Sequence, residues 1–172
     1  MKTITARNVN GAILRGVDLF NDKVNYREQE SRNGKTLEAV EPVTTTYLRP
    51  TERVCLIPER DANPFFHFIE SMWMLAGRND LKSLTYYVAS MSNFSDDGET
   101  LWGAYGYRWR QYFHKDQINM VVKLLKENPD DRRAVLQMWD ANKDLARVSK
   151  DVPCNTNIYF KIRDGVLNMT VC

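Results

Sequence analysis

The sequence predicts an α+β fold in which a mixed β-sheet carries helices packed on one face. Three patterns lead to this class. The first third of the chain is rich in threonine, valine and turn residues, residues 64–77 repeat apolar side chains at helical spacing, and residues 157–172 alternate apolar and polar side chains. With 172 residues, 43% of them apolar, the chain can bury one core, so we expect a single domain over residues 1–172.

The strand-forming region comes first. Asn33-Gly34 and Pro42 are turn formers that would break it into short pieces. Three segments on either side of these breaks favour short antiparallel strands: AILRGVDLF (12–20), RNGKTLEAV (32–40) and EPVTTTYLRP (41–50).

Helical patterns follow from residue 64. Residues 64–77 predict a mostly buried helix that ends at Gly77, because apolar side chains recur at i, i+3, i+4 and i+7. A second helix is expected over residues 80–88, and the acidic, glycine-containing stretch 91–103 is typical of a surface loop. Asp116 predicts the N-cap of an amphipathic helix that ends before Pro129.

The last segments read as strands. Residues 134–139 (AVLQMW) are short and apolar, and Ile158, Phe160 and Ile162 alternate with polar neighbours. Asp164-Gly165 predicts a two-residue type I′ hairpin turn, since both positions of that turn need positive φ. The return strand runs to the last residue, so we expect a domain that is incomplete at its C-terminus.

Composition excludes several classes of protein. Lysine and arginine number 24 against 22 acidic residues, which gives no electrostatic footprint for nucleic acid or an anionic membrane. The amino terminus lacks a signal-peptide core, and no apolar run approaches the roughly 20 residues that span a bilayer. The three cysteines lack CxxC spacing and the two histidines lack ligand spacing, so we expect no metal site and reduced thiols in a cytoplasmic protein.

Cys154 is the first candidate for chemistry. It follows Pro153 at the entrance of a predicted strand, a rigid position that suits a nucleophile. The thiolate is the reactive form, and nearby positive charge favours it. The alternative is a small buried side chain, because free cysteine is among the most buried residue types.

Arginines are the candidate anion ligands. Arg132 and Arg133 precede the apolar strand 134–139, and guanidinium pairs match phosphate in a bidentate manner. A solvated pair neutralised by Asp130 and Asp131 is the alternative. Arg32 lies in SRNGKT, where a plain hairpin turn explains the string equally well.

Glu70 stands out within the predicted helix 64–77. Among apolar neighbours its carboxylate would be desolvated and its pKa raised, which suits proton transfer near neutrality. The alternative is a side chain that points to solvent. The aromatic string 101–113 contains Tyr105, Arg108 and Trp109, which could stack a ring and bind charge together, although such strings more often form a core.

Together, and in this order, these strings resemble the thymidylate synthase family, which includes the pyrimidine nucleotide hydroxymethylases. SRNGKT resembles the phosphate-binding loop with Arg32, and FIESMWMLAG resembles the helix with the family's glutamate at Glu70. LWGAYGYRWR resembles the string that supplies Tyr105 and Trp109 to the substrate site. The likeness covers about residues 30–172.

Two further strings complete the resemblance. DRRAVLQMWD resembles the double-arginine strand, which implies that Arg132 and Arg133 reach across a homodimer, formed by the other sheet face, to the nucleotide phosphate of the partner subunit. PCN resembles the nucleophile motif at Cys154. Cys154 would then add to C6 of a pyrimidine deoxynucleotide monophosphate, and C5 would take a one-carbon unit from 5,10-methylenetetrahydrofolate. Glu70 would move protons together with ordered water.

The resemblance leaves three functions open. Reductive methylation of dUMP to dTMP is the first expectation, hydroxymethylation of dUMP or dCMP is the alternative, and a non-catalytic nucleotide-binding or interaction protein is the rival. Asn155 replaces the usual histidine, Arg108 a glutamine and Met91 a folate-packing tryptophan. A differently packed folate ring would admit water, which favours hydroxymethylation. The family's residues that distinguish uracil from cytosine would lie beyond Cys172.

Overall fold

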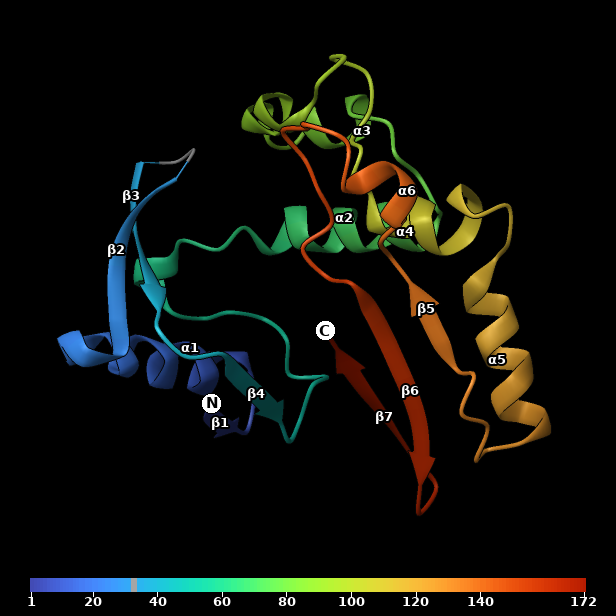
Figure 1. Cartoon of the computed structure of the whole chain (residues 1–172), viewed down its shortest axis with the longest axis horizontal. Helices are drawn as coiled ribbons and strands as arrows, with labels where there is room; N and C mark the ends of the chain where they lie inside the picture. Colours follow the sequence, from blue (N-terminus) through green and yellow to red (C-terminus); the bar gives the residue numbers. More distant parts are fainter. Residues whose placement is uncertain (32–33) are drawn as a thin grey trace. The chain divides into compact units, whose positions relative to one another are not determined.

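The computed structural model describes residues 1–31 and 34–172 and combines helices with parallel and antiparallel strand pairs (Figure 1). The predicted α+β class is confirmed. The chain forms two compact units, Met1–Pro64 and Phe65–Cys172. The single domain over residues 1–172 stays a prediction.

In the first unit, β1 (Lys2–Ala6) pairs with β4 (Val43–Tyr47), and α1 (Val9–Asp18) packs against β1. The pairing is parallel, from Lys2 opposite Val43 to Ala6 opposite Tyr47. The prediction of antiparallel pairing was therefore wrong for residues 41–50. The reason is topological, because a helix and a hairpin separate the two strands and let the second return in the same direction.

The prediction of a strand over residues 12–20 was also wrong, since most of this segment lies in α1. The Asn8 side chain caps the helix by accepting a hydrogen bond from the Gly11 amide. Ala12 and Leu19 are seven residues apart, so both lie on the helical face that packs against Ile4 and Ala6. The helical period of these contacts outweighed the local strand preference.

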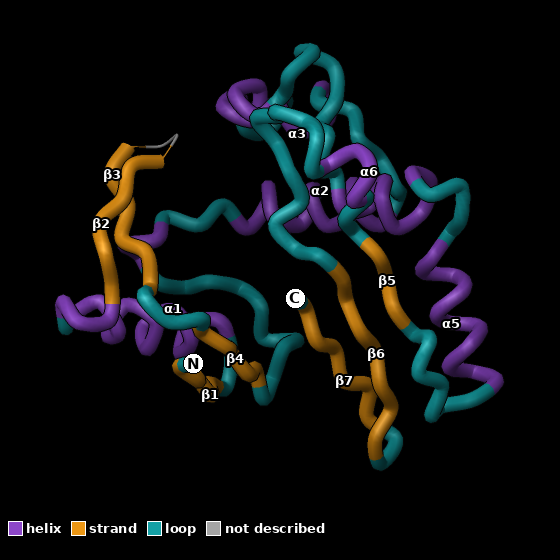
Figure 2. Tube along the Cα trace, in the orientation of Figure 1, coloured by secondary structure: helices purple, strands orange, loops and turns teal. Residues whose placement is uncertain are grey.

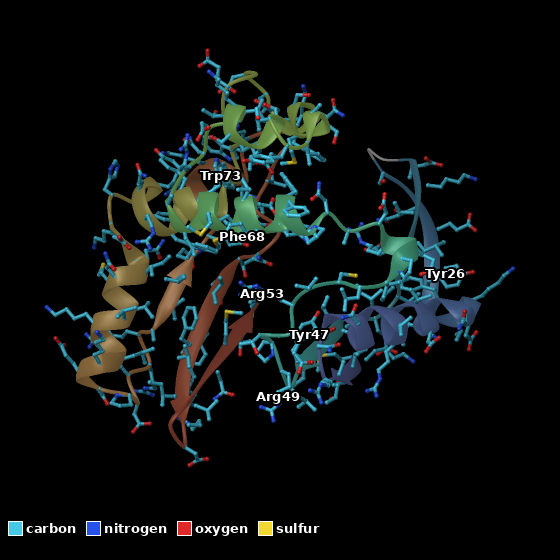
Figure 3. All side chains as sticks on the ribbon, turned by 180° about the vertical axis from the view of Figure 1, so that it is seen from behind. Tyr26, Tyr47, Arg49, Arg53, Phe68 and Trp73 are labelled. Carbon is cyan, nitrogen blue, oxygen red and sulfur yellow. The ribbon has the colours of Figure 1, made fainter. Side chains whose placement is uncertain are left out.

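The second strand pair of this unit is a hairpin, as expected for residues 34–39. β2 (Tyr26–Ser31) and β3 (Gly34–Ala39) are antiparallel, and Tyr26 stands opposite Ala39. Figure 3 labels Tyr26 at the base of the hairpin, and its ring centroid lies 5.8 Å from that of Phe20. The predicted turn residue Asn33 lies outside the described residues, and so does Arg32.

The second unit contains α2 (Pro64–Leu75) from Phe65 onward, and this helix confirms the one predicted over residues 64–77. Gly77, with φ +69°, follows the last turn. The expectation of a mostly buried helix was wrong. Trp73 is buried, whereas Phe65, Phe68, Met72 and Leu75 are each more than half exposed; Figure 3 labels Phe68 and Trp73. One stripe of the helix packs against a core of four buried residues, Leu81, Leu84, Leu101 and Ala104.

The next elements are short. α3 (Lys82–Thr85) covers only part of the helix predicted over 80–88, and Leu101, 6% exposed, belongs to the core although 91–103 was predicted as a surface loop. α4 (Tyr105–Tyr107) continues into a π-helical turn, Arg108–Tyr112. The remaining short turns are 3₁₀ helices: Leu19–Asn21, Lys23–Asn25, Pro58–Arg60 and Ala89–Phe94.

The amphipathic helix and the C-terminal strands follow the sequence prediction. α5 (Gln117–Glu127) is capped by Asp116, which accepts from the Asn119 amide. β5 (Val135–Gln137), β6 (Asn157–Arg163) and β7 (Val166–Val171) form an antiparallel sheet in that order (Figure 2). α6 (Ala141–Asp144) lies between β5 and β6 in the chain.

The β6–β7 turn has the predicted geometry, with positive φ at Asp164 (51°) and Gly165 (73°). α5 covers one face of the sheet through a core of five buried residues, Val121, Leu125, Ala134, Leu136 and Ile158. The β7 residues opposite the inward-facing positions of β6, namely Leu167, Met169 and Val171, are exposed. No helix in the described part of the chain is long and apolar enough to cross a membrane.

Candidate active site

A pocket of about 260 Å³ lies in the second unit, where α2 meets the segment that leads into α4. Glu70 and Tyr105, both predicted as site residues, line it together with Asp151. Its apolar wall is formed by five side chains: Trp73, Met74, Leu84, Met91 and Leu101. Gly103 and Ala104 complete the lining.

Glu70 reaches the pocket because it shares a face of α2 with Trp73 and Met74, three and four residues further along the helix. The carboxylate is half-buried. Burial raises the pKa of Glu70, and the coulombic effect of nearby His67 lowers it by less. The environment matches the desolvated carboxylate expected from the sequence.

Cys154 and Tyr105 are in contact. The Cys154 amide donates a hydrogen bond to the Tyr105 hydroxyl oxygen at 3.3 Å. Burial and, to a smaller extent, the neighbouring Cys154 side chain together raise the pKa of Tyr105 to about 12. Pro153 is fully buried, whereas Cys154 itself is exposed, so the rigid proline anchors a thiol that solutes can reach.

Trp109 lies beside this group rather than in the lining of the pocket. Its ring packs against the core between α5 and the sheet, and its indole Nε1 lies 2.8 Å from the Met138 sulfur. The centroid of the Trp109 ring is 6.4 Å from that of Tyr105. The Trp109 ring therefore lies next to the Tyr105 ring, outside the lining of the pocket.

The two arginines predicted to bind phosphate, Arg132 and Arg133, are exposed and lie away from the lining of the pocket. Arg133 Nη2 forms an ion pair with Asp131 Oδ2 at 2.6 Å, and hydrogen bonds from Arg133 lower the pKa of Asp131 to about 2. Arg132 forms no ion pair with any residue that the structure describes. Arg32 lies outside the described residues, so its place relative to the pocket stays a prediction.

The sequence left two alternatives for Arg108, a charge-binding group beside an aromatic ring of the site or part of a core. The structure agrees with the core, because the Arg108 side chain is fully buried in an ion pair with Asp144 at 2.7 Å. Burial raises the pKa of Asp144, while hydrogen bonds from Arg108, the Asp140 amide and Trp102 together lower it below its usual value. The guanidinium is thus occupied inside the protein.

Sequence reasoning missed Asp144 and Asp151. Asp151 stands three residues before Cys154, and an acidic residue so close to a proposed nucleophile was a signal for the pocket. Asp144 gave only an indirect signal, since an arginine within an aromatic string needs a buried acidic partner somewhere in the chain. Within the described residues, no three histidine, cysteine or acidic side chains are grouped as metal ligands.

Fold and site together define a class of protein. The fold is similar to that of thymidylate synthase from T4 phage, with a TM-score of 0.52 and 22% identity over 63% of this chain and 43% of that one. The model of the family described as thymidylate synthase matches residues 21–172. The chain belongs to the thymidylate synthase family, which confirms the resemblance found in the sequence.

Relatives within the family carry a more specific name. The deoxyuridylate hydroxymethyltransferase of Pseudomonas phage M6 is 52% identical over 172 residues, which are 99% of this chain and 48% of that protein. Proteins of the same name from Bacillus phage SP01 and Delftia phage PhiW-14 are 32% and 30% identical, over 90% and 98% of this chain and 43% and 48% of their own lengths. The chain spans about half the length of the curated relatives that it matches.

Proposed function

We propose that this protein transfers a hydroxymethyl group to C5 of dUMP. The observation that carries the proposal is the 52% identity, over 99% of this chain, to a protein named deoxyuridylate hydroxymethyltransferase. Two more distant relatives share that name. The hydroxymethylase alternative is therefore better supported than the reductive methylation of dUMP that we expected first.

Cys154 is the proposed nucleophile. Its thiolate would add to C6 of the uracil ring, which makes C5 nucleophilic. The exposed side chain is accessible to a nucleotide, and the buried Pro153 fixes the start of the segment. The Tyr105 hydroxyl accepts a hydrogen bond from the Cys154 amide, so in the proposed reaction the phenol would lie near the reacting sulfur.

The pocket fits a flat, partly apolar ring. Trp73 and Met91 offer an aromatic face and a flexible thioether, and Glu70 offers a carboxylate that can accept hydrogen bonds from ring nitrogens. These residues would hold the pterin of 5,10-methylenetetrahydrofolate, which when bound would supply the one-carbon unit. Because the pKa of Glu70 is raised, this group can give and take protons closer to neutral pH than an ordinary carboxyl.

Hydroxymethylation needs a water molecule where methylation needs a hydride. Two acidic residues, Glu70 and Asp151, line the same pocket, and carboxylate oxygens are strong acceptors for water. Met91 leaves more freedom than a rigid tryptophan would at the position noted in the sequence. Both features support addition of water to the one-carbon unit held at C5.

Phosphate binding is proposed to involve two subunits. Arg132 and Arg133 are exposed beside the start of β5, outside the lining of the pocket of their own chain. In a homodimer they would bind the nucleotide phosphate in the site of the partner subunit, and Arg32 would bind it from within the same subunit. Guanidinium groups bind phosphate strongly because both hydrogen bonds are charge-assisted.

The test is covalent trapping followed by product analysis, performed on the full-length protein. Incubation with 5-fluoro-dUMP and 5,10-methylenetetrahydrofolate should give an adduct at Cys154 that is detectable by mass spectrometry, and Cys154→Ala should abolish it. With dUMP, the product mass should correspond to a 5-hydroxymethyl group; a 5-methyl product would contradict hydroxymethylation. With dCMP in place of dUMP, we expect no product.

The same experiment addresses a non-catalytic protein. In that case nucleotide binding would survive Cys154→Ala, no adduct would form with the unmodified protein, and no product would appear. An adduct that persists in Cys154→Ala would identify another nucleophile, and Cys55→Ala and Cys172→Ala serve as matched controls because both thiols are also free.

A further inference from the structure

We propose that Arg108 is a positioning residue for Cys154. Its buried guanidinium holds two segments of the chain in place, and residues before and after Cys154 form hydrogen bonds to these two segments. Arg108 occupies the position where the family's usual residue is a glutamine. The geometric part of this inference is independent of the reaction, and only its kinetic consequence rests on the proposed function.

The guanidinium is the centre of a buried network. Arg108 Nη1 donates to the Met138 carbonyl at 2.7 Å and to Asp144 Oδ2 at 2.7 Å. Nη2 donates to Asp144 Oδ1 at 2.9 Å and to the Trp102 carbonyl at 3.1 Å. The side chains of Arg108 and Asp144 are both 0% exposed. The planar guanidinium therefore links three parts of the chain: the end of β5, α6 and the turn before α4.

The first of these contacts leads to Pro153 and Thr156. Trp139 follows Met138 in the chain, and its indole Nε1 donates a hydrogen bond to the Pro153 carbonyl at 2.9 Å. The Met138 amide donates to the Thr156 carbonyl at 3.0 Å. The segment that carries Cys154 is thus fastened immediately before and two residues after the sulfur.

The contact between Arg108 and the Trp102 carbonyl extends to Asp151. The residue after Trp102 is Gly103, whose amide donates to Asp151 Oδ2 at 2.8 Å. The approach is close, because a Cβ atom at Gly103 would lie 3.0 Å from Asp151 Oδ1 and 3.0 Å from the Val152 carbonyl carbon. The chain before Cys154 is therefore held at Asp151 as well as at Pro153.

Arginine suits this role for geometric reasons. Its five donors lie in one rigid plane and it keeps its charge, so it can hold two carbonyls and a carboxylate in a fixed arrangement. A buried ion pair contributes little net stability relative to well-packed apolar side chains, because both charges lose their hydration. What the pair does provide here is a fixed distance between the Trp102 turn and the end of β5.

The experiment compares three variants of the full-length protein. Arg108→Lys keeps the charge but loses the planar fork, and Trp139→Phe keeps the ring but removes the donor to Pro153. Asp116→Asn is the matched control, because Asp116 forms an ion pair with Arg110 at the same 2.7 Å and has no contact with the Cys154 segment. Asparagine also preserves the N-cap of α5.

Two measurements separate positioning from general stability. Hydrogen–deuterium exchange of the amides in residues 151–156 should become about ten-fold faster in Arg108→Lys and Trp139→Phe, with the α5 amides unchanged. Turnover of dUMP should fall by about ten-fold or more at nearly constant KM, because a displaced nucleophile affects the transition state more than binding. Asp116→Asn should match the unmodified protein in both.

Two results would overturn the proposal: a Trp139→Phe protein that melts like the unmodified one and keeps its kcat, or exchange that accelerates equally throughout the unit. If the unmodified protein does not hydroxymethylate dUMP, the proposed function fails. The exchange measurement, which needs no substrate, then decides the positioning role by itself.

Discussion

Single residues carry the proposed chemistry through their surroundings. Glu70 and Glu127 are both helical glutamates, but Glu127 is exposed and paired with Lys123, whereas Glu70 is half-buried in the lining of the pocket. Burial disfavours the ionised form, so it raises the pKa of Glu70. The position of Glu70 on α2 determines this burial.

Glu70→Gln should lower the turnover of dUMP by about 100-fold, the size of a lost general acid–base group, with a much smaller change in nucleotide binding. The same substitution should increase the stability of the protein at neutral pH. Because burial raises the pKa of Glu70 above the usual 4.5, the folded state is penalised once the carboxyl ionises, and the penalty is absent at pH values well below 4.5.

The glutamine variant should therefore be more stable than the unmodified protein at neutral pH, with the difference vanishing in acid. Urea unfolding at several pH values measures this, and Glu127→Gln is the exposed control. A loss of stability at neutral pH together with normal turnover would mean that Glu70 is structural.

Arg132→Ala should raise the KM for dUMP by about ten-fold to a hundred-fold, the equivalent of one charge-assisted phosphate contact. Arg133→Ala should also raise the KM, since Arg133 is exposed like Arg132, although its guanidinium forms an ion pair with Asp131. Arg163→Ala is the control, because Arg163 is an exposed arginine paired with Asp130 in the same way. Steady-state kinetics measure these KM values. Equal KM values for all three variants would mean that Arg132 and Arg133 are solvated surface residues that do not bind the phosphate.

At the scale of elements, the contact between α2 and α4 determines the shape of the pocket wall. Gly106 is buried in α4, and a Cβ atom there would lie 1.8 Å from the Met74 carbonyl oxygen. Only glycine allows α4 to approach α2 this closely. The approach places Tyr105, the residue before Gly106, in the lining of the same pocket as Glu70.

Gly106→Ala should reduce the free energy of unfolding by about 1–3 kcal/mol or more, because the added methyl group forces α2 and α4 apart. Gly16→Ala in α1 is the matched control. A Cβ atom at Gly16 meets nothing within 4 Å, so alanine there should stabilise the helix by about 0.5–1 kcal/mol. Thermal unfolding of both variants checks the pair, and a Gly106→Ala protein of unchanged stability would show that the two helices can separate freely.

Elements with purely local signals were predicted well. The Asp116 cap and the apolar period of α5, and the alternation and Asp164-Gly165 turn of β6 and β7, depend only on neighbours in the sequence. Residues 12–20 misled because Ile13, Leu14 and Val17 also suit a strand, and only packing on β1 selects the helix.

At the scale of the whole molecule, we propose that each site combines residues of two subunits. If Cys154 and Arg132 of one site come from different chains, a mixture of Cys154→Ala and Arg132→Ala proteins should recover activity. Random exchange of subunits makes half of the dimers mixed, and each mixed dimer restores one of two sites. At dUMP concentrations well below the raised KM of Arg132→Ala, the recovery should therefore approach about one quarter of the unmodified activity.

Activity assays after subunit exchange, with each variant alone as the control, measure this recovery. If both residues served the same subunit, every site in the mixture would contain one defect, and activity would stay at the level of the single variants.

Apolar surface also bears on the whole molecule. Phe65, Phe68 and Met72 on α2, and Leu167 and Met169 on β7, are more than half exposed in this chain. Large exposed apolar side chains in a row mark surfaces that other protein segments cover. The helix predicted as mostly buried was thus recognised by a real apolar pattern, although the described residues leave much of it uncovered.

The sequence by itself determined the family, the order of the motifs and the residue types of the site, because these depend on which side chains follow one another. For Glu70 the sequence left two alternatives, because an acidic residue among apolar neighbours on a helix is desolvated if it points inward but not if it points to solvent. Only the tertiary structure decided that Arg108 is buried against Asp144 and that Asp151 shares the pocket with Glu70. Those pairings join residues 36 or more positions apart, and no local pattern encodes which distant partner a buried charge will meet.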